Sequence, residues 1–220
     1  MKKRILSILL LCCMVLTMLP TTVLAADGPM DTIPKYDVSI DVYNRTSDIS
    51  IKDSRSYYIY SSVPDKLRDT WAWDKKIFIK GDKTAPHVFI DGVNIEMSPS
   101  SKGPAIELNK KASAYIYFIG KNSSLQGADG RAAIQKNRSE GQLYVLARTG
   151  TTVTCKGGDK AAGIGGSYAT RNISNGYYNG DMYGHGVNMH FGSRSNPDYW
   201  GGIIAAIGGR NGAGIGAGRG

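Results

Sequence analysis

The stretch VFIDGVNIEM, residues 88–97, is followed 28 residues later by IYFIGKNSSL (116–125) and then by YVLARTGTTV (144–153). Aligning these segments places Gly92 over Gly120 and Asn94 over Asn122. Apolar residues share an offset in four columns, which are Val88/Ile116/Tyr144, Phe89/Tyr117/Val145, Ile90/Phe118/Leu146 and Met97/Leu125/Val153. Such a period is typical of repeat proteins, in which each repeat buries its apolar face against the next.

Short alternating runs dominate the rest of the chain, as in DVSIDVY (37–43) and KIFIK (76–80). Alternation over so few residues predicts β-strands, and turn-forming segments such as GDKTAP (81–86) separate them. Only PDKLRDTWAW (64–73) leaves room for a helix. Strands and turns repeated at this period predict an all-β fold, a parallel β-helix (β-solenoid) with about 28 residues per coil and little helix. The alternative is a β-sandwich with accidental spacing.

Glycine and alanine surround a lone isoleucine in AAGIGG (161–166) and again in GAGIGAG (212–218). Ile106 and Ile134 lead to the first of these isoleucines with an offset of two residues. We therefore expect a narrow coil there, closed by small residues around one inward aliphatic side chain. IIAAIGG (203–209) reads as a further coil. Because solenoids need a capping element and the last residues offer none, we expect the natural protein to continue beyond Gly220.

Residues 1–25 have the form of a secretory signal peptide, with a basic start, an apolar run and small residues before a cut after Ala25. The alternative, a membrane anchor, is disfavoured because the apolar part from Ile5 to Leu19 is shorter than the roughly 20 residues that a bilayer needs. Cleavage would remove three of the 27 basic residues. The 24 that remain outnumber the 18 acidic residues and give the mature chain a net charge of +6. Cys155 is then the single cysteine, which excludes an intrachain disulfide framework.

These features divide the chain into five parts. Residues 1–25 are the signal peptide, 26–75 hold N-terminal strands and a cap, and 76–166 hold the regular coils. Residues 167–200 form a long Tyr- and Gly-rich insertion, and 201–220 hold glycine-rich coils that we expect to be cut short. In a solenoid, such insertions map to loops on one face, often the binding face.

Aromatic residues crowd the insertion, and they are the candidate ligand-binding residues: Tyr177, Tyr178, Tyr183, Tyr199 and Trp200. Sugar rings stack on flat aromatic faces, and Tyr and Trp add a polar edge. The alternative is that these side chains pack the loop against the solenoid wall. A second aromatic group is predicted to cap the N-terminal end, namely Trp71 and Trp73 with Tyr57, Tyr58 and Tyr60.

The motifs FIDGVNIEM (89–97), AIEL (105–108) and AGIGG (162–166) resemble secreted β-helix proteins of Gram-positive bacteria. The family they resemble is the clostridial polysaccharide-binding β-helix family, described as a carbohydrate-binding domain. The resemblance covers residues 38–166 and resumes at Gly201. It implies a right-handed parallel β-helix, a non-catalytic role, binding to plant or cell-wall polysaccharide, and bound calcium.

No catalytic constellation emerges from the residues themselves. The carboxylates of Asp91, Glu107, Asp129 and Asp159 are scattered, whereas glycoside hydrolysis needs two across the scissile bond. Asp129 and Asp159 are turn residues whose carboxylate oxygens could bind a calcium ion. Calcium is therefore the one cofactor that the sequence leaves as an alternative. His185 and His190 are five apart, which on a strand puts them on opposite faces, so we expect no metal site there.

Polar residues also recur at the same period. Asn109 aligns with Asn137 and predicts a short asparagine ladder. Basic residues align in the pairs Lys110/Arg138, Lys83/Lys111 and Lys80/Lys136. On a solenoid these pairs would form outward stripes, either a solvated face or a track for an anionic polymer.

The sequence thus predicts a secreted or cell-surface, non-catalytic polysaccharide-binding module. The partner would be cellulose, a pectin-like polymer or a cell-wall glycan. Nucleic acid binding is disfavoured by export, and membrane insertion by removal of the leader. The alternatives are a structural or adhesive segment of a larger bacterial surface protein and, less favoured, a polysaccharide lyase.

Overall fold

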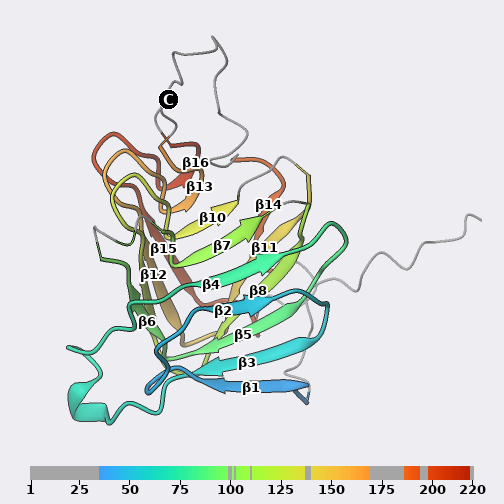
Figure 1. The fold of residues 1–220 in the computed structure, drawn as a ribbon, viewed down its shortest axis with the longest axis vertical. Helices are drawn as coiled ribbons and strands as arrows, with labels where there is room; N and C mark the ends of the chain where they lie inside the picture. Colours follow the sequence, from blue (N-terminus) through green and yellow to red (C-terminus); the bar gives the residue numbers. More distant parts are fainter. Residues whose placement is uncertain are drawn as a thin grey trace, which may run out of the picture. The chain divides into compact units, whose positions relative to one another are not determined.

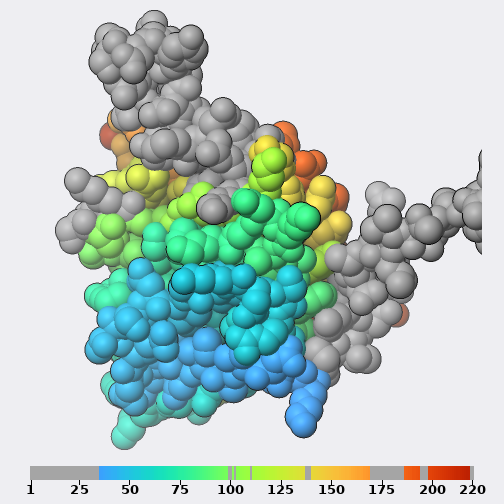
Figure 2. Space-filling model, turned by 45° about the vertical axis from the view of Figure 1, so that its right-hand side comes forward, coloured from blue at the N-terminus to red at the C-terminus, as the bar shows by residue number. Residues whose placement is uncertain are grey.

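Three parallel β-sheets, here named A, B and C, run through the computed structural model of the chain (Figure 1). The structure describes residues 35–98, 101, 103–109, 111–136, 140–168, 186–193 and 198–218. From β5 onward each turn adds one strand to sheet A, then to sheet C, then to sheet B, whereas β1 to β4 alternate between sheets A and B; each strand pairs with the equivalent strand of a neighbouring turn. Bands of colour therefore follow one another in chain order in Figure 2. The predicted β-solenoid is confirmed.

Within the described residues, four turns contribute a strand to all three sheets. Sheet A contains β1 (Val38–Asp41), β3 (Ser56–Tyr60), β5 (His87–Asp91), β8 (Ala114–Ile119), β11 (Leu143–Ala147) and β14 (Met189–Phe191). Sheet C contains β6 (Asn94–Glu96), β9 (Ser123–Gln126), β12 (Thr152–Lys156) and β15 (Ile203–Ile207). Sheet B contains β2 (Ile49–Ile51), β4 (Ile77–Lys80), β7 (Ile106–Asn109), β10 (Ile134–Lys136), β13 (Ile164–Gly165) and β16 (Ile215–Gly216).

The described ranges contain the short 3₁₀ segment η1 (Asp65–Leu67), inside the stretch that the sequence left open for a helix. No helix in this part of the chain has the length and apolar character needed to cross a membrane.

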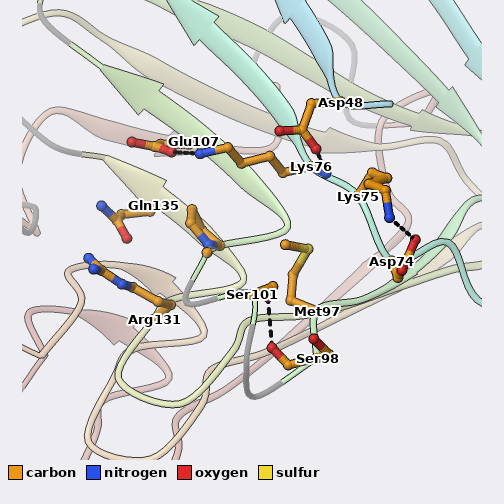
Figure 3. A pocket seen from close by; sticks show the side chains of 12 residues that line it. Asp48, Asp74, Lys75, Lys76, Met97, Ser98, Ser101, Glu107, Arg131 and Gln135 are labelled. Atoms are coloured by element: carbon orange, nitrogen blue, oxygen red, sulfur yellow. Dashed lines mark hydrogen bonds and ion pairs between the residues drawn. The ribbon is translucent and has the colours of Figure 1, made fainter. Parts of the chain in front are cut away.

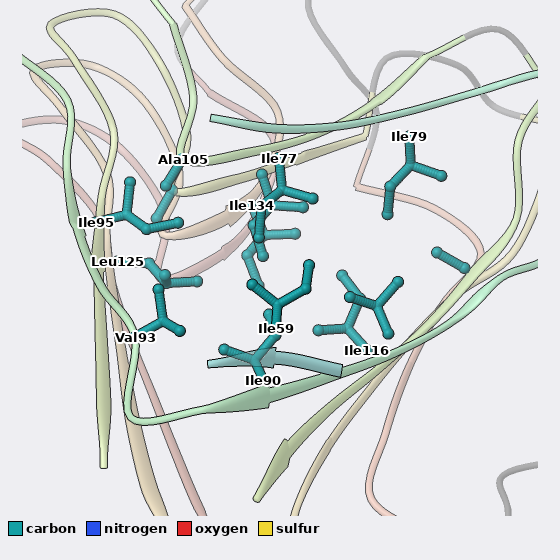
Figure 4. Packing of buried hydrophobic residues seen from close by; sticks show 14 of the residues in the cluster. Ile59, Ile77, Ile79, Ile90, Val93, Ile95, Ala105, Ile116, Leu125 and Ile134 are labelled. Carbon is teal, nitrogen blue, oxygen red and sulfur yellow. The ribbon is translucent and has the colours of Figure 1, made fainter. Parts of the chain in front are cut away.

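Columns of stacked aliphatic side chains fill the interior (Figure 4). The longest column lies on sheet B and consists of Ile49, Ile77, Ile106, Ile134, Ile164 and Ile215. All of these except Ile215 are buried. The isoleucines of AAGIGG and GAGIGAG are thus the last two members of one column, as the offset in the sequence predicted. Side chains alternate along each strand, so one face of every strand supplies the core and the other faces outward.

The repeat length varies, whereas the sequence predicted a constant one. Val88 pairs with Ile116, as the predicted period requires, but Ile116 pairs with Val145 and not with Tyr144. Tyr144 instead pairs with Tyr115 on the outer face, so its predicted place in the Val88 column is wrong. The connection from Ile134 to Val145 holds one residue more than the equivalent connection from Ile106 to Ile116. A shift of one residue turns a side chain to the opposite face.

Sheet C repeats at a longer interval, because Ile95 pairs with Leu125, and Leu125 pairs with Cys155. Both steps are longer than the step from Val88 to Ile116 on sheet A. The predicted column of Met97, Leu125 and Val153 is therefore wrong. The observed column consists of Ile95, Leu125 and Cys155. Cys155 is a free, buried thiol in this column.

One member of the predicted basic stripes faces inward. Lys136 pairs with Leu108, in the column that begins with Ile51 and Ile79, and only 1% of its surface is exposed. Lys80 pairs with Asn109 and does not share a column with Lys136. The predicted outward stripe of these two lysines is therefore wrong. Lys110 and Arg138 lie outside the described residues, as does Asn137, the predicted ladder partner of Asn109.

Glycine has distinct uses at the corners and in the narrow turns. Gly92 and Gly120 occupy equivalent corners with φ of 62° and 64°, a backbone conformation that favours glycine. Gly165 has φ of 125°, and a Cβ atom there would clash with the carbonyl oxygen of Gly216. Small residues thus allow successive turns to approach one another near the isoleucine column.

Candidate functional site

A polar groove of about 530 Å³ lies along the outer side of sheet B (Figure 3). Its lining comes from β2, β4, β7 and β10 or the residues just before them, so four successive turns contribute to it. The described residues between β6 and β7 form one wall. The lining residues are Asp48, Asp74, Lys75, Lys76, Met97, Ser98, Ser101, Gly103, Pro104, Glu107, Arg131 and Gln135.

An ion pair between neighbouring turns fixes the middle of the groove. The Nζ atom of Lys76 lies 2.7 Å from a carboxylate oxygen of Glu107, and both side chains are largely shielded from solvent. The backbone N–H of Lys76 donates to Asp48, 3.1 Å away, which ties in the turn before it. The ammonium group also lies 4.9 Å from the ring centre of Phe78. These contacts hold Asp48, Lys76 and Glu107 in a fixed order along the axis.

The rim of the groove carries a more exposed pair. Lys75 donates to Asp74 at 2.7 Å, and this hydrogen bond lowers the pKa of the Asp74 carboxyl group. Figure 3 shows Lys75 turned toward Asp74, apart from the Lys76–Glu107 pair. Opposite, Ser101 donates to the carbonyl oxygen of Ser98 at 2.7 Å and shapes the wall.

The groove presents donors and acceptors in balance. Its lining contains three carboxylates (Asp48, Asp74 and Glu107) and three cationic groups (Lys75, Lys76 and Arg131), together with the amide of Gln135. Such a set can form hydrogen bonds with the hydroxyl groups of a neutral ligand in both directions. Among the residues that the structure describes, no cluster of three or more His, Cys, Asp or Glu side chains could hold a metal ion.

Two of the five aromatic residues predicted to bind ligand are described, and they lie on sheet A. Trp200 is buried, with its ring centre 5.0 Å from that of Tyr117 on the outer face of the sheet. Tyr199 packs edge-on against Trp200 at 4.8 Å, with the Arg148 guanidinium 5.2 Å from its ring centre. Thr149 anchors this segment, because its N–H donates to the Tyr199 carbonyl oxygen at 2.9 Å. Tyr177, Tyr178 and Tyr183 lie outside the described residues.

These contacts correspond to the alternative left open by the sequence, in which the insertion packs against the solenoid wall. They apply to Tyr199 and Trp200 and not to the three other tyrosines. The predicted ligand-binding residues that are described therefore do not contribute to the groove on sheet B.

A ladder of stacked rings also runs along sheet A. His87, Tyr115, Tyr144 and His190 occupy one outward column. Successive ring centres lie 4.5, 4.6 and 4.4 Å apart, with interplanar angles of 15° or less. The faces of the inner rings contact each other, so this ladder presents ring edges to its surroundings. His190 belongs to it, and His185 lies outside the described residues.

The N-terminal aromatic group divides between interior and surface. Trp73 is buried, and its indole N–H donates to the Arg45 carbonyl oxygen at 2.8 Å. Trp71 is partly buried against the core, and Tyr57 faces inward. Tyr58 and Tyr60 face outward and stack on each other at 5.1 Å.

The groove escaped the sequence analysis, which judged Glu107 to be one of several scattered carboxylates. One signal was available. Asp48, Lys76 and Ala105 each precede a member of the isoleucine column, and Glu107 follows one. Charged residues beside a stacked apolar column must lie close together on the outer side of the wall. The wall residues Met97, Ser98 and Ser101, which make a groove of this surface, left no such signal.

Comparison with known protein families, with characterised proteins and with solved structures finds no match to this chain.

Proposed function

We propose that the chain is a non-catalytic polysaccharide-binding module, and that the groove on sheet B holds one extended glycan strand. The observation that carries the proposal is the origin of the lining in four successive turns. Neighbouring turns of a β-sheet stack about 4.8 Å apart, so equivalent backbone positions recur along the groove at that spacing. A polymer of repeating units can use such a recurrent surface over its whole length.

The chemistry of the lining supports a hydroxyl-rich ligand. Carboxylate and ammonium groups alternate along the groove and are already held by Lys76–Glu107 and Lys75–Asp74 contacts. Groups that are preorganised lose little conformational entropy when a ligand binds. Because the charges of the lining balance, we expect neutral glycans to bind in preference to polyanions. In this proposal the leader, residues 1–25, exports the chain, and the glycan belongs to the cell wall or lies outside the cell.

The test is retention of the protein on insoluble cellulose, chitin, cross-linked polygalacturonate and peptidoglycan. The full chain is expressed with its leader and purified from the medium of a secreting bacterium. We expect at least one neutral glycan to retain it. Lys75→Ala should weaken that binding about tenfold, because a charge-assisted hydrogen bond contributes about 1.5–3 kcal/mol.

Lys111→Ala is the matched control, because Lys111 is also an exposed lysine beside a carboxylate, that of Glu140, and lies away from the groove. The proposal fails if no glycan retains the protein, or if the two variants bind equally well. Release of unsaturated uronides from polygalacturonate would replace it with the lyase alternative.

A further inference from the structure

A second polar groove lies on the outer face of sheet C, and it shares no lining residue with the groove on sheet B. It consists of two adjoining hollows of about 650 and 150 Å³, which have Asp69, Asn94 and Ser124 in common. Its floor comes from β6, β9 and β12 and the residues just before β9, so three successive turns contribute to it. Residues of the segment 65–72, which begins with η1, form the wall.

Polar contacts fasten this wall to the sheet. The Nζ atom of Lys121 lies 2.8 Å from a carboxylate oxygen of Asp65. The Arg68 guanidinium donates to the Gly92 carbonyl oxygen at 3.1 Å, and the side-chain amide of Asn94 donates to the Arg68 carbonyl oxygen at 3.0 Å. The groove is therefore formed before any ligand arrives, so little conformational entropy is lost on binding.

Hydroxyl groups form a small regular array on the floor. Ser124 and Thr154 pair in neighbouring turns, and Thr152 lies two residues before Thr154 on the same outward face. Strand geometry places the first two residues about 4.8 Å apart and the two threonines about 6.6 Å apart. Within the described part of the chain, no hydrogen bond occupies these three hydroxyl groups, although the backbone N–H groups of Ser124 and Thr152 are bonded. Each hydroxyl can donate one hydrogen bond and accept two.

The smaller hollow adds an indole ring and two carboxylates. Trp71 lines it and is only partly buried, and Asp69 and Glu96 line it as well. An indole offers an apolar face and a polar edge, which suit the apolar face of a sugar ring and its hydroxyl groups. No cationic side chain is among the described residues that line this hollow, so its carboxylates would repel a polyanion. The combination favours a neutral glycan.

We propose that the groove on sheet C is a second site for a neutral glycan, and that one chain holds two glycan strands at once. The two grooves lie on different sheets and have separate linings, so one ligand does not exclude the other. The cross-linking of two strands rests on the function proposed for the groove on sheet B, whereas the site on sheet C does not. Two sites on one chain also raise the strength of attachment to a polymer, because the second contact is intramolecular.

Tryptophan fluorescence of the full chain, titrated with cellohexaose and with chitohexaose, tests the second site. Trp73 and Trp200 are buried, so a ligand in this groove should change the emission of Trp71, and Trp71→Phe should abolish the change. We expect a saturable change with at least one of the two oligosaccharides and none with hexagalacturonate. Ser124→Lys should weaken this binding at least about tenfold, because its long side chain fills the floor and removes a hydroxyl group. Ser39→Lys, at an exposed outward position of sheet A, is the matched control and should bind as the wild type does.

Light scattering of a dissolved polymer tests the cross-linking, with hydroxyethyl cellulose or glycol chitin chosen to match the oligosaccharide that binds. Wild-type protein should raise the scattering, and Lys75→Ala and Ser124→Lys should each reduce that rise.

The outcomes separate the two sites. No fluorescence change with either oligosaccharide would overturn the second site, and a change that Ser124→Lys leaves intact would overturn its location. Binding at both grooves without a rise in scattering would overturn the cross-linking. A fluorescence change that Ser124→Lys removes, together with retention that Lys75→Ala leaves unaltered, would refute the groove on sheet B and support the site on sheet C.

Discussion

Single residues show how strictly the stacked turns sort side chains between interior and surface. Lys136 is the clearest case, because it continues the column of Ile51, Ile79 and Leu108 and is almost fully buried. Its Nζ atom donates to the Glu140 carbonyl oxygen at 3.0 Å. Burial lowers the pKa of this ammonium group, and Glu140 acts in the opposite direction. The side chain thus places a charge where its neighbours place methyl groups.

Replacing Lys136 by Met should stabilise the protein. The substitution keeps most of the side-chain volume and removes a desolvated charge, and comparable replacements of buried ionic groups are neutral or stabilising by about 1–4 kcal/mol. We expect a gain of about 1 kcal/mol in the free energy of unfolding in urea at pH 7. Lys156→Met, at an exposed position of β12, is the control and should change this free energy little. A loss of stability in Lys136→Met would show that the ammonium contacts outweigh its burial.

The same pair of proteins gives a pH test. Because the pKa of Lys136 is lower in the folded state than its ordinary value of 10.5, the unfolded state binds more protons between the two values. Wild-type stability therefore rises with pH in that interval relative to Lys136→Met. We expect the difference between the two proteins to shrink as the pH approaches 10.5. A difference that is constant from pH 7 upward would contradict the assignment.

Asp53 predicts a response to acid. The hydrogen bond from Arg55, helped by that from Tyr57, lowers the pKa of Asp53 to about 2 from an ordinary value of 3.8. A depressed carboxyl pKa contributes stability that is present above pH 3.8 and is lost as the pH falls toward 2. Between pH 5 and pH 2, the urea midpoint should fall less steeply in Asp53→Asn than in the wild type. Asp69→Asn, at an exposed loop position, should keep the wild-type slope, and equal slopes for all three proteins would refute the prediction.

At the scale of elements, a short strand inside a sheet is stabilised by pairing on both sides and by tightly fitting connections. β13 has only two residues, yet it pairs with β10 and β16, and its isoleucine is buried. The narrowness of this part of the turn depends on residues without a side chain. Gly165 is the test position, because its backbone conformation and its close neighbour both oppose a Cβ atom.

Gly165→Ala should cost more than Gly150→Ala. Both residues have positive φ, 125° and 84°, so both variants incur backbone strain of about 1 kcal/mol. A Cβ atom at Gly150 would have no neighbour within 4 Å, whereas one at Gly165 would clash with the Gly216 carbonyl oxygen. We expect Gly165→Ala to lower the free energy of unfolding by at least about 1 kcal/mol more, measured in urea. Equal losses would mean that the turns can separate without cost.

The ring ladder of sheet A should contribute to stability. Tyr115 stacks on His87 at 4.5 Å and on Tyr144 at 4.6 Å, and aromatic pairs contribute about 0.5–1.5 kcal/mol each. Tyr115→Leu should therefore destabilise by about 1–3 kcal/mol, whereas Tyr115→Phe keeps both stacks and should lose less. Equal urea midpoints for the two variants would assign the effect to the hydroxyl group and not to stacking.

At the scale of the whole molecule, a solenoid is a one-dimensional array. Each turn contacts the turns before and after it, so stability depends on nearest-neighbour interfaces. In the central turns, strands β8 and β9 each pair with a strand on both sides. By contrast, β15 ends its sheet within the described residues. The last described turn also has exposed apolar side chains, among them Ile203 and Ile207.

Hydrogen exchange should follow this order. Amides of β15 should exchange faster than those of β8 and β9, because terminal turns open with lower free energy. Uniform protection along the chain would contradict the array description.

The sequence by itself determined the architecture, because the information needed for it is periodic and local. Alternation in 37–43 and 76–80 predicted strands, and recurrence of VFIDGVNIEM predicted stacked turns. The offset isoleucine of AAGIGG predicted where the column continues. These signals survive small changes in turn length, because an apolar column has to stack on an apolar column.

Only the tertiary structure decided the face on which individual side chains lie and where a site forms. Small differences in length between successive turns move a side chain across the wall, which is why Tyr144 faces outward and Lys136 inward. The groove on sheet B depends on the placement of Met97, Ser98 and Ser101 beside that sheet, and Trp200 reaches Tyr117 from a distant part of the chain. Such positions follow from the summed lengths of many connections and from packing at a distance, and neither is encoded in any short stretch of sequence.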